Sequence, residues 1–199
     1  PPRSPVLWGL IGIITVVTLI QWTVSPVQVD WMYRAFAVIG GPEFQDIERP
    51  FGAAPPYVLH TLLHGGVAHL GFNMFALFGL GSQLIRFFGP SAKGAIAFLA
   101  FFAFCAVGGA AAQVMLYAVT GESGIAIGAS SAISGLLPAL GYVMGGWKGA
   151  LRNSVVWVLI NIAIAFAGAA MPIPLAWAAH IGGVIAGFSV PFFLRWAWR

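Results

Sequence analysis

Residues 94–119 read GAIAFLAFFAFCAVGGAAAQVMLYAV and contain no charged side chain. A helix needs about 20 apolar residues to cross the ~30 Å hydrocarbon core of a bilayer. The stretch is long enough for this, and its glycines and alanines would let neighbouring helices approach closely. It therefore predicts a transmembrane helix.

The composition of the whole chain indicates the same class. Of its 199 residues, 60% are hydrophobic and only 7% are charged, whereas a soluble domain carries about 25% charged residues. The formal net charge is +4, but the basic residues are scattered singly, so nucleic acid is not an expected partner. The chain begins with Pro1 rather than Met, and we expect it to be a processed or trimmed product.

Six segments are apolar enough and long enough to span a bilayer. They cover residues 5–24, 57–85, 94–119, 127–147, 151–170 and 174–198. We therefore expect an all-α polytopic membrane protein, a single bundle of six transmembrane helices over residues 1–199. The second segment is longer than a span requires, so its first turns are expected in the interface.

The charged residues separate by side if these spans alternate. All five acidic residues fall on one side, together with Arg34 and Arg49. The other basic residues fall on the opposite side: Arg3, Arg86, Lys93, Lys148, Arg152, Arg195 and Arg199. Because basic loops stay in the cytoplasm, we expect both termini to be cytoplasmic, in the inner or cell membrane of a bacterium.

The one long connection, residues 25–56, then lies outside. It holds four of the five acidic residues and several aromatic ones: Trp31, Tyr33, Phe36, Phe44 and Phe51. Its aromatic content favours a structured segment lying on or in the interface.

The sequence GASSAISG, residues 128–135, lies at the outer end of the fourth predicted span. A serine at a helix N-terminus has free backbone N–H groups beside it, and these can bind a developing oxyanion. Ser130 is therefore a candidate nucleophile. Taken alone, the pattern is more typical of close helix packing through small residues.

The sequence HTLLHGGVAHLGFN, residues 60–73, contains three histidines and an asparagine. His69 and Asn73 are four residues apart, so they share a helix face and both can donate hydrogen bonds. His60 and His64 have the same spacing, which would suit a metal. However, two glycines separate His64 from His69, and no carboxylate or thiolate lies near to complete a ligand set. We predict no metal site.

The sequence AHIGGVIAG, residues 179–187, begins the sixth predicted span. His180 lies about 9 Å below the outer end of that span at 1.5 Å per residue, a depth that Ser130 and His69 can share. His180 is therefore a candidate general base. No acidic residue is available to orient it, so a Ser-His dyad rather than a triad is expected.

These motifs, in this order, resemble the rhomboid intramembrane serine proteases over about residues 57–190. The resemblance implies a six-helix fold with a water-accessible cavity open to the outside. It implies Ser130 as nucleophile and His180 as base, with His69, Asn73 and the Ser130 N–H as the oxyanion hole. It also implies that the protein cleaves transmembrane helices of other membrane proteins near their outer ends.

The chain departs from the family pattern at four places. Ser131 replaces a glycine after the nucleophile, and Ser134 replaces an aromatic residue that packs on the base in many members. Residues 55–56 are Pro-Pro instead of Trp-Arg, and residues 85–87 are Ile-Arg-Phe instead of Glu-x-Arg. Because the dyad and both oxyanion side chains are present, these changes affect the loops more than the chemistry.

The expected enzyme needs no cofactor, and its expected partners are substrate helices and the bilayer. Its cavity is expected to be lined by His64, Gln113, Ser131 and Ser134. Two alternatives stay open: a metal-binding or transport protein built on His60, His64 and His69, and an inactive binder of transmembrane helices.

Overall fold

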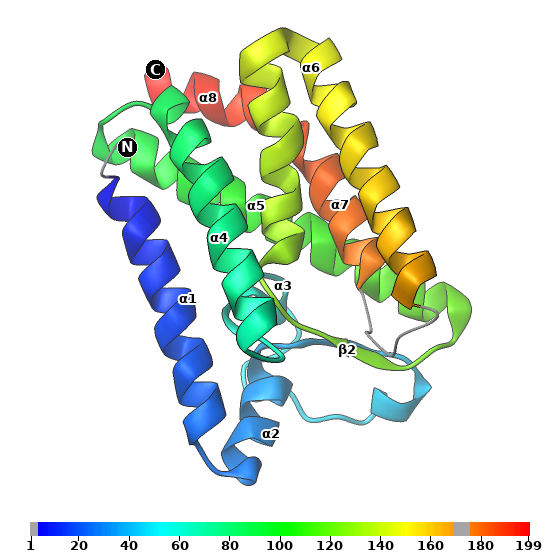
Figure 1. Cartoon of the computed structure of the whole chain (residues 1–199). Coiled ribbons are helices and arrows are strands. Elements are labelled where there is room, and N and C mark those ends of the chain that lie inside the picture. Colours follow the sequence, from blue (N-terminus) through cyan, green and yellow to red (C-terminus); the bar gives the residue numbers. More distant parts are fainter. Residues whose placement is uncertain (1–3, 169–175) are drawn as a thin grey trace.

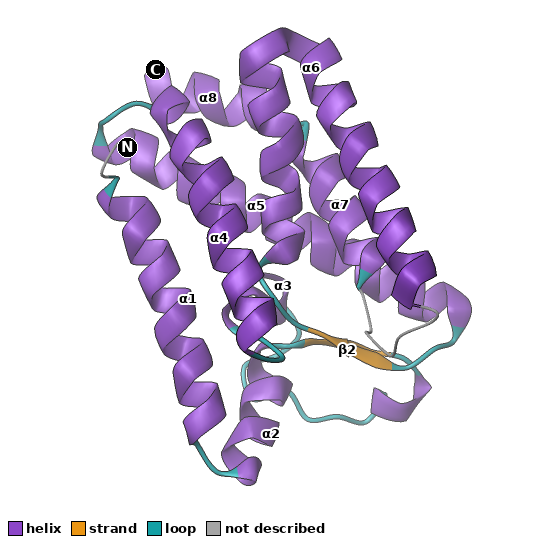
Figure 2. Cartoon of the chain, in the orientation of Figure 1, coloured by secondary structure: helices purple, strands orange, loops and turns teal. Residues whose placement is uncertain are grey.

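The computed structural model describes residues 4–168 and 176–199, and it is mostly helical (Figures 1 and 2). The helices are α1 (Pro5–Thr23), α2 (Pro26–Phe36), α3 (Pro56–Leu59), α4 (Val67–Leu84), α5 (Ala92–Thr120), α6 (Ser130–Gly168), α7 (Trp177–Gly187) and α8 (Val190–Trp198). Three short 3-10 turns, η1 (Pro42–Phe44), η2 (His60–Leu62) and η3 (Ile85–Phe88), and the strands β1 (Val38–Gly40) and β2 (Gly124–Ala126) complete the described elements.

Among the described residues, α1 and α5 are each long and apolar enough to cross a membrane. Two bent pairs also qualify if each is one span: α3–η2 with α4–η3, bent by 104°, and α7 with α8, bent by 46°. The prediction of a polytopic, mostly helical membrane protein is therefore confirmed, with two to four candidate spans among the described residues. The all-α prediction missed the short sheet formed by β1 and β2.

The second predicted span is broken where its two glycines lie. Residues 56–62 form a separate short segment, and α4 begins at Val67. The predicted fourth and fifth spans are joined as α6, whose backbone leaves helical geometry at Gly145 and Gly146. Residues 169–170 and 174–175 of the last two predicted spans lie outside the described residues.

The bundle is centred on α5, α6 and α7, which contact one another, while α4 packs on α6 and α1 packs on α4. Glycines make the approach of α7 to α6 close. A methyl group at Gly183 would collide with the carbonyl oxygen of Ser131, and one at Gly187 would collide with that of Gly135. This approach brings the start of α7 beside the start of α6.

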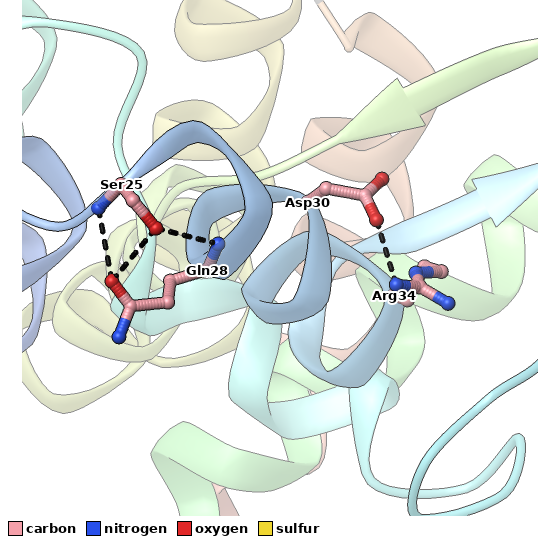
Figure 3. A network of polar contacts seen from close by, with 4 residues as sticks. All are labelled: Ser25, Gln28, Asp30 and Arg34. Carbon is pink, nitrogen blue, oxygen red and sulfur yellow. Dashed lines mark hydrogen bonds and ion pairs between the residues drawn. The ribbon is translucent and has the colours of Figure 1, made fainter.

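The predicted external loop is structured in its first half. Helix α2 begins with a capping box in which Ser25 and Gln28 satisfy each other's backbone N–H groups (Figure 3). Strand β1 then pairs antiparallel with β2, with Val38 opposite Ala126. The guanidinium of Arg49 donates to the carbonyl oxygens of Ala37 and Ile39, at 2.8 and 3.0 Å. The loop is thereby fixed to the segment that leads into Ser130.

Candidate active site

Ser130 and His180 lie in contact at the starts of two helices. Ser130 is the first residue of α6, and His180 lies in the first turn of α7. The Ser130 Oγ is 2.8 Å from Nε2 of His180. The imidazole is only 5% exposed. A hydroxyl bonded to an imidazole nitrogen is the arrangement in which the ring can take the serine proton.

The other ring nitrogen of His180 is bonded to Asn161, a residue that sequence analysis did not single out. Nδ1 of His180 contacts Oδ1 of Asn161, and the Asn161 amide nitrogen donates to the Trp157 carbonyl oxygen at 2.9 Å. The amide is thus oriented with its oxygen toward the imidazole. Asn161 is 3% exposed, and the signal that could have identified it is a buried amide in an otherwise apolar span.

Ser134 lies one turn after Ser130 and is fully buried. Its hydroxyl donates to the Ser130 carbonyl oxygen at 2.7 Å and accepts from the Trp157 indole N–H at 3.0 Å. The Trp157 ring lies 6.0 Å from the His180 ring between centroids, at 43°. An aromatic ring therefore does lie beside the base, although residue 134 is a serine; it comes from the second half of α6.

His69 lies against the backbone that precedes Ser130. Its Nδ1 accepts a hydrogen bond from the Gly65 N–H at 3.3 Å. A Cβ atom at Gly128, where φ is +117°, would lie 2.7 Å from Nε2 of His69, so only glycine fits this backbone position.

Asn73 is buried one turn further along α4, and its amide nitrogen donates to the His69 carbonyl oxygen at 2.8 Å. In the described part of the chain, neither His69 nor Asn73 is hydrogen-bonded to Ser130. Both residues lie in α4 four positions apart, as the sequence predicted. Their role as oxyanion donors stays a prediction.

Other polar residues of the predicted site are bonded within the bundle. Nδ1 of His60 donates to the Pro56 carbonyl oxygen at 2.9 Å, so its Nε2 accepts from the Ser131 hydroxyl at 2.8 Å. The Ala179 N–H donates to Oε1 of Gln113 at 3.3 Å. These two side chains connect the starts of α6 and α7 to η2 and α5.

His64 is fully buried and connects α1 to the residue that precedes Ser130. Its Nδ1 contacts the Thr18 hydroxyl at 3.0 Å, and the Ala129 N–H donates to its Nε2 at 3.4 Å. The Trp22 indole N–H donates to its carbonyl oxygen at 3.0 Å. His64, Gln113, Ser131 and Ser134 are thus buried and hydrogen-bonded, and a wet cavity lined by them stays a prediction.

The histidines do not gather as metal ligands. Within residues 4–168 and 176–199, no three His, Cys, Asp or Glu side chains lie close enough together to hold an ion. His60 and His64, which have the metal-like spacing, are instead bonded to the hydroxyls of Ser131 and Thr18.

Comparisons with known proteins relate the chain to one family. Residues 54–197 match the model of the Rhomboid domain. The chain is 33% identical over 132 residues to "Rhomboid protease GluP" of Bacillus subtilis (strain 168), which is 64% of this chain and 23% of that protein. It is 30% identical over 141 residues to "RHOMBOID-like protein 5" of Arabidopsis thaliana, and 32% identical over 142 residues to "RHOMBOID-like protein 6, mitochondrial" of the same plant. Each of these two matches covers 66% of this chain and 41% of the plant protein, so the chain spans less than half the length of these relatives.

Proposed function

This chain belongs to the rhomboid family, and from that membership we propose that it is an intramembrane serine endopeptidase. The single observation that carries the proposal is the 2.8 Å contact between the Ser130 hydroxyl and Nε2 of His180. The two residues lie 50 positions apart in the chain and on different helices. A hydroxyl and an imidazole at this distance, the serine half-buried and the imidazole buried, fit the nucleophile and general base of acyl transfer.

In the proposed reaction, the Ser130 oxygen attacks the carbonyl carbon of a peptide bond while its proton moves to Nε2 of His180. The tetrahedral intermediate then collapses: the C–N bond breaks, and the proton on Nε2 passes to the leaving amine. A water molecule, deprotonated by the same nitrogen, then attacks the acyl carbon. The ester C–O bond breaks, and the proton on Nε2 returns to the Ser130 oxygen. Every proton in this sequence moves through one imidazole nitrogen.

The negative oxygen of the intermediate needs donors that are already in place. The N–H of Ser130 lies at the N-terminus of α6, where backbone donors have no partner within the helix. Nε2 of His69 lies beside Gly128, two residues before the nucleophile. The Asn73 amide has a second N–H beyond the one that donates to its own helix. We assign these three groups to the oxyanion hole.

The proposed topology has six spans with both termini in the cytoplasm. The spans are α1, α4, α5, the two halves of α6 on either side of Gly145–Gly146, and α7 with α8. The charge distribution supports it, since the loops that hold most of the basic residues then lie on the cytoplasmic side. The site lies toward the outer side, in the inner or cell membrane of a bacterium.

The proposed substrates are transmembrane segments of other membrane proteins, cut near their outer ends. Water must reach the acyl-enzyme from the outer side, because the hydrocarbon core excludes it. The mechanism uses no metal or organic cofactor, so we expect chelators to leave the activity unchanged.

The proposal is tested by comparing Ser130→Ala with Ser131→Ala in detergent, using a transmembrane peptide as substrate. Ser130→Ala should lose at least about 10⁴-fold in turnover and all labelling by a serine-directed fluorophosphonate. Ser131→Ala, whose lost hydroxyl is bonded to His60, should still be labelled. An active Ser130→Ala with an inactive Ser131→Ala would contradict the assignment, and an unlabelled, inactive wild type would favour an inactive binder of helices.

A further inference from the structure

The second half of α6 presents a row of polar side chains to the bundle. Asn153, Trp157 and Asn161 follow one another at four-residue spacing, so they share one face of the helix. Each makes a hydrogen bond across to another part of the bundle: to the Leu137 carbonyl oxygen, the Ser134 hydroxyl and the His180 ring. On other faces of the same helix, Val155, Leu159 and Ile162 are exposed, as expected of side chains that face lipid.

Two of these contacts complete a closed ring of hydrogen bonds around the proposed base. Starting at Ser130, the ring passes through His180 to Asn161, from Asn161 to the Trp157 carbonyl group, and from the Trp157 indole to Ser134. The Ser134 hydroxyl then returns to the Ser130 carbonyl oxygen. Both halves of α6 are thus connected through the imidazole of α7.

We propose that Asn161 is a positioning residue for this enzyme: its amide oxygen accepts the Nδ1–H of His180 and so holds the ring with its unprotonated Nε2 toward the Ser130 hydroxyl. This inference rests on the proposed function and deepens it. The site then contains a Ser-His-Asn arrangement, with a neutral amide in the place where other serine proteases carry an acid.

The hydrogen-bond inventory fixes the direction of each bond. An amide oxygen only accepts and an amide nitrogen only donates. Because the Asn161 nitrogen donates to the Trp157 carbonyl oxygen, its oxygen is the atom that faces His180. Nδ1 of the ring must therefore carry the proton, which leaves the Nε2 lone pair for the Ser130 hydroxyl. The opposite tautomer would place two acceptors face to face at Asn161, and it would leave Nε2 without a lone pair to take the Ser130 proton.

The Trp157–Ser134 bond keeps Asn161 within reach of the ring. Gly145 and Gly146 interrupt the helix between its two halves, so the second half is not fixed by helical continuity alone. One turn before Asn161, the Trp157 indole N–H donates to the Ser134 hydroxyl, one turn into the first half. Trp157 therefore fixes the distance between the half of α6 that carries Asn161 and the half that carries Ser130.

The test compares wild type with Asn161→Leu, Asn161→Asp and the matched control Asn153→Leu. Leucine keeps the approximate volume and removes the acceptor, whereas aspartate keeps an acceptor oxygen at the same place. Asn153→Leu removes a half-buried amide from the same helix face that does not contact His180. Each protein is assayed in detergent for kcat and KM on a transmembrane peptide and for its unfolding midpoint.

Asn161→Leu should lower kcat by about 10²-fold, toward the lower end of the ~10²–10⁴-fold that a positioned general base contributes, and leave KM within about twofold. Asn161→Asp should recover most of kcat, and Asn153→Leu should retain it. A purely packing role would make both leucine variants lose kcat in proportion to their stability and would give aspartate no advantage. Either of those results, or a wild-type kcat in Asn161→Leu, would overturn the inference.

A readout independent of turnover separates this inference from the proposed function. The ¹⁵N chemical shifts of His180, assigned by comparison with His180→Ala, should show protonation at Nδ1 in wild type and a mixture of tautomers in Asn161→Leu. Inactive wild-type protein with this tautomer shift would defeat the protease proposal alone. If wild type is active and the His180 tautomer is the same in wild type and in Asn161→Leu, only the proposed role of Asn161 is contradicted.

Discussion

The segment around α2 and the ring around His180 both contain short polar contacts, but they differ in their exposure to water. In α2, the carboxylate of Asp30 lies 2.7 Å from the guanidinium of Arg34 (Figure 3), and these side chains are 65% and 31% exposed. In the ring, His180 is 5% exposed and Asn161 is 3% exposed. The lengths of the contacts are similar, so distance alone does not distinguish the two regions.

The environment decides what each contact contributes. Water solvates and salt screens an exposed ion pair, which contributes about 0–1 kcal/mol to stability. A buried donor or acceptor that loses its partner costs about 1–3 kcal/mol, because no water replaces the bond. We therefore expect polar substitutions near His180 to affect activity and stability strongly, and equivalent ones in α2 to affect them little.

The largest effect that tests this comparison is expected for Asn73→Ala. Loss of one oxyanion donor lowers turnover by about 10²–10³-fold, measured as kcat on a transmembrane peptide. Gln83 is the control, since its amide nitrogen also donates to a carbonyl oxygen one turn earlier on α4, but it is exposed. An equal loss of kcat in Asn73→Ala and Gln83→Ala would contradict the prediction that the buried amide matters more than the exposed one.

A smaller effect is expected where α7 crosses α6. Gly183→Ala places a methyl group against the Ser131 carbonyl oxygen, so α7 must shift, at a cost of about 1–3 kcal/mol of unfolding free energy. Turnover should fall as well, because the shift moves His180 away from Ser130. Gly12→Ala in α1, where a methyl group would meet no atom within 4 Å, is the control. An unfolding midpoint unchanged by Gly183→Ala would mean that the crossing is not tightly packed.

The smallest effect is expected for Asp30→Asn. The exposed ion pair with Arg34 should contribute no more than about 0.5 kcal/mol, the usual value for a pair four residues apart on a helix. The unfolding free energy in detergent should therefore change little, and kcat should match wild type. Asp46→Asn, on the same loop and without an ion pair in the described part of the chain, gives the baseline. A loss of more than about 1 kcal/mol relative to that baseline would place α2 among the segments that hold the fold together.

The sequence predicted the membrane class and the family because both depend on local patterns. Uncharged stretches such as residues 94–119 exceed the length of a span, and they can be recognised without knowing which helices pack against them. The break before α4 was not predicted, since residues 57–85 were assigned to one span with its first turns in the interface, and the structure breaks that span at Gly65 and Gly66. The strands β1 and β2 were not visible, because each has three residues and only their pairing across the chain identifies them.

The sequence by itself determined that this chain is a mostly helical membrane protein of the rhomboid family, with a small set of polar residues at costly positions in apolar spans. Only the tertiary structure decided which of those residues meet. The bond from Asn161 to His180, and the aromatic ring that Trp157 supplies beside it, depend on how far each helix is rotated and how closely α7 approaches α6. Those quantities are set by packing between segments distant in the chain, and no spacing within a single helix encodes them.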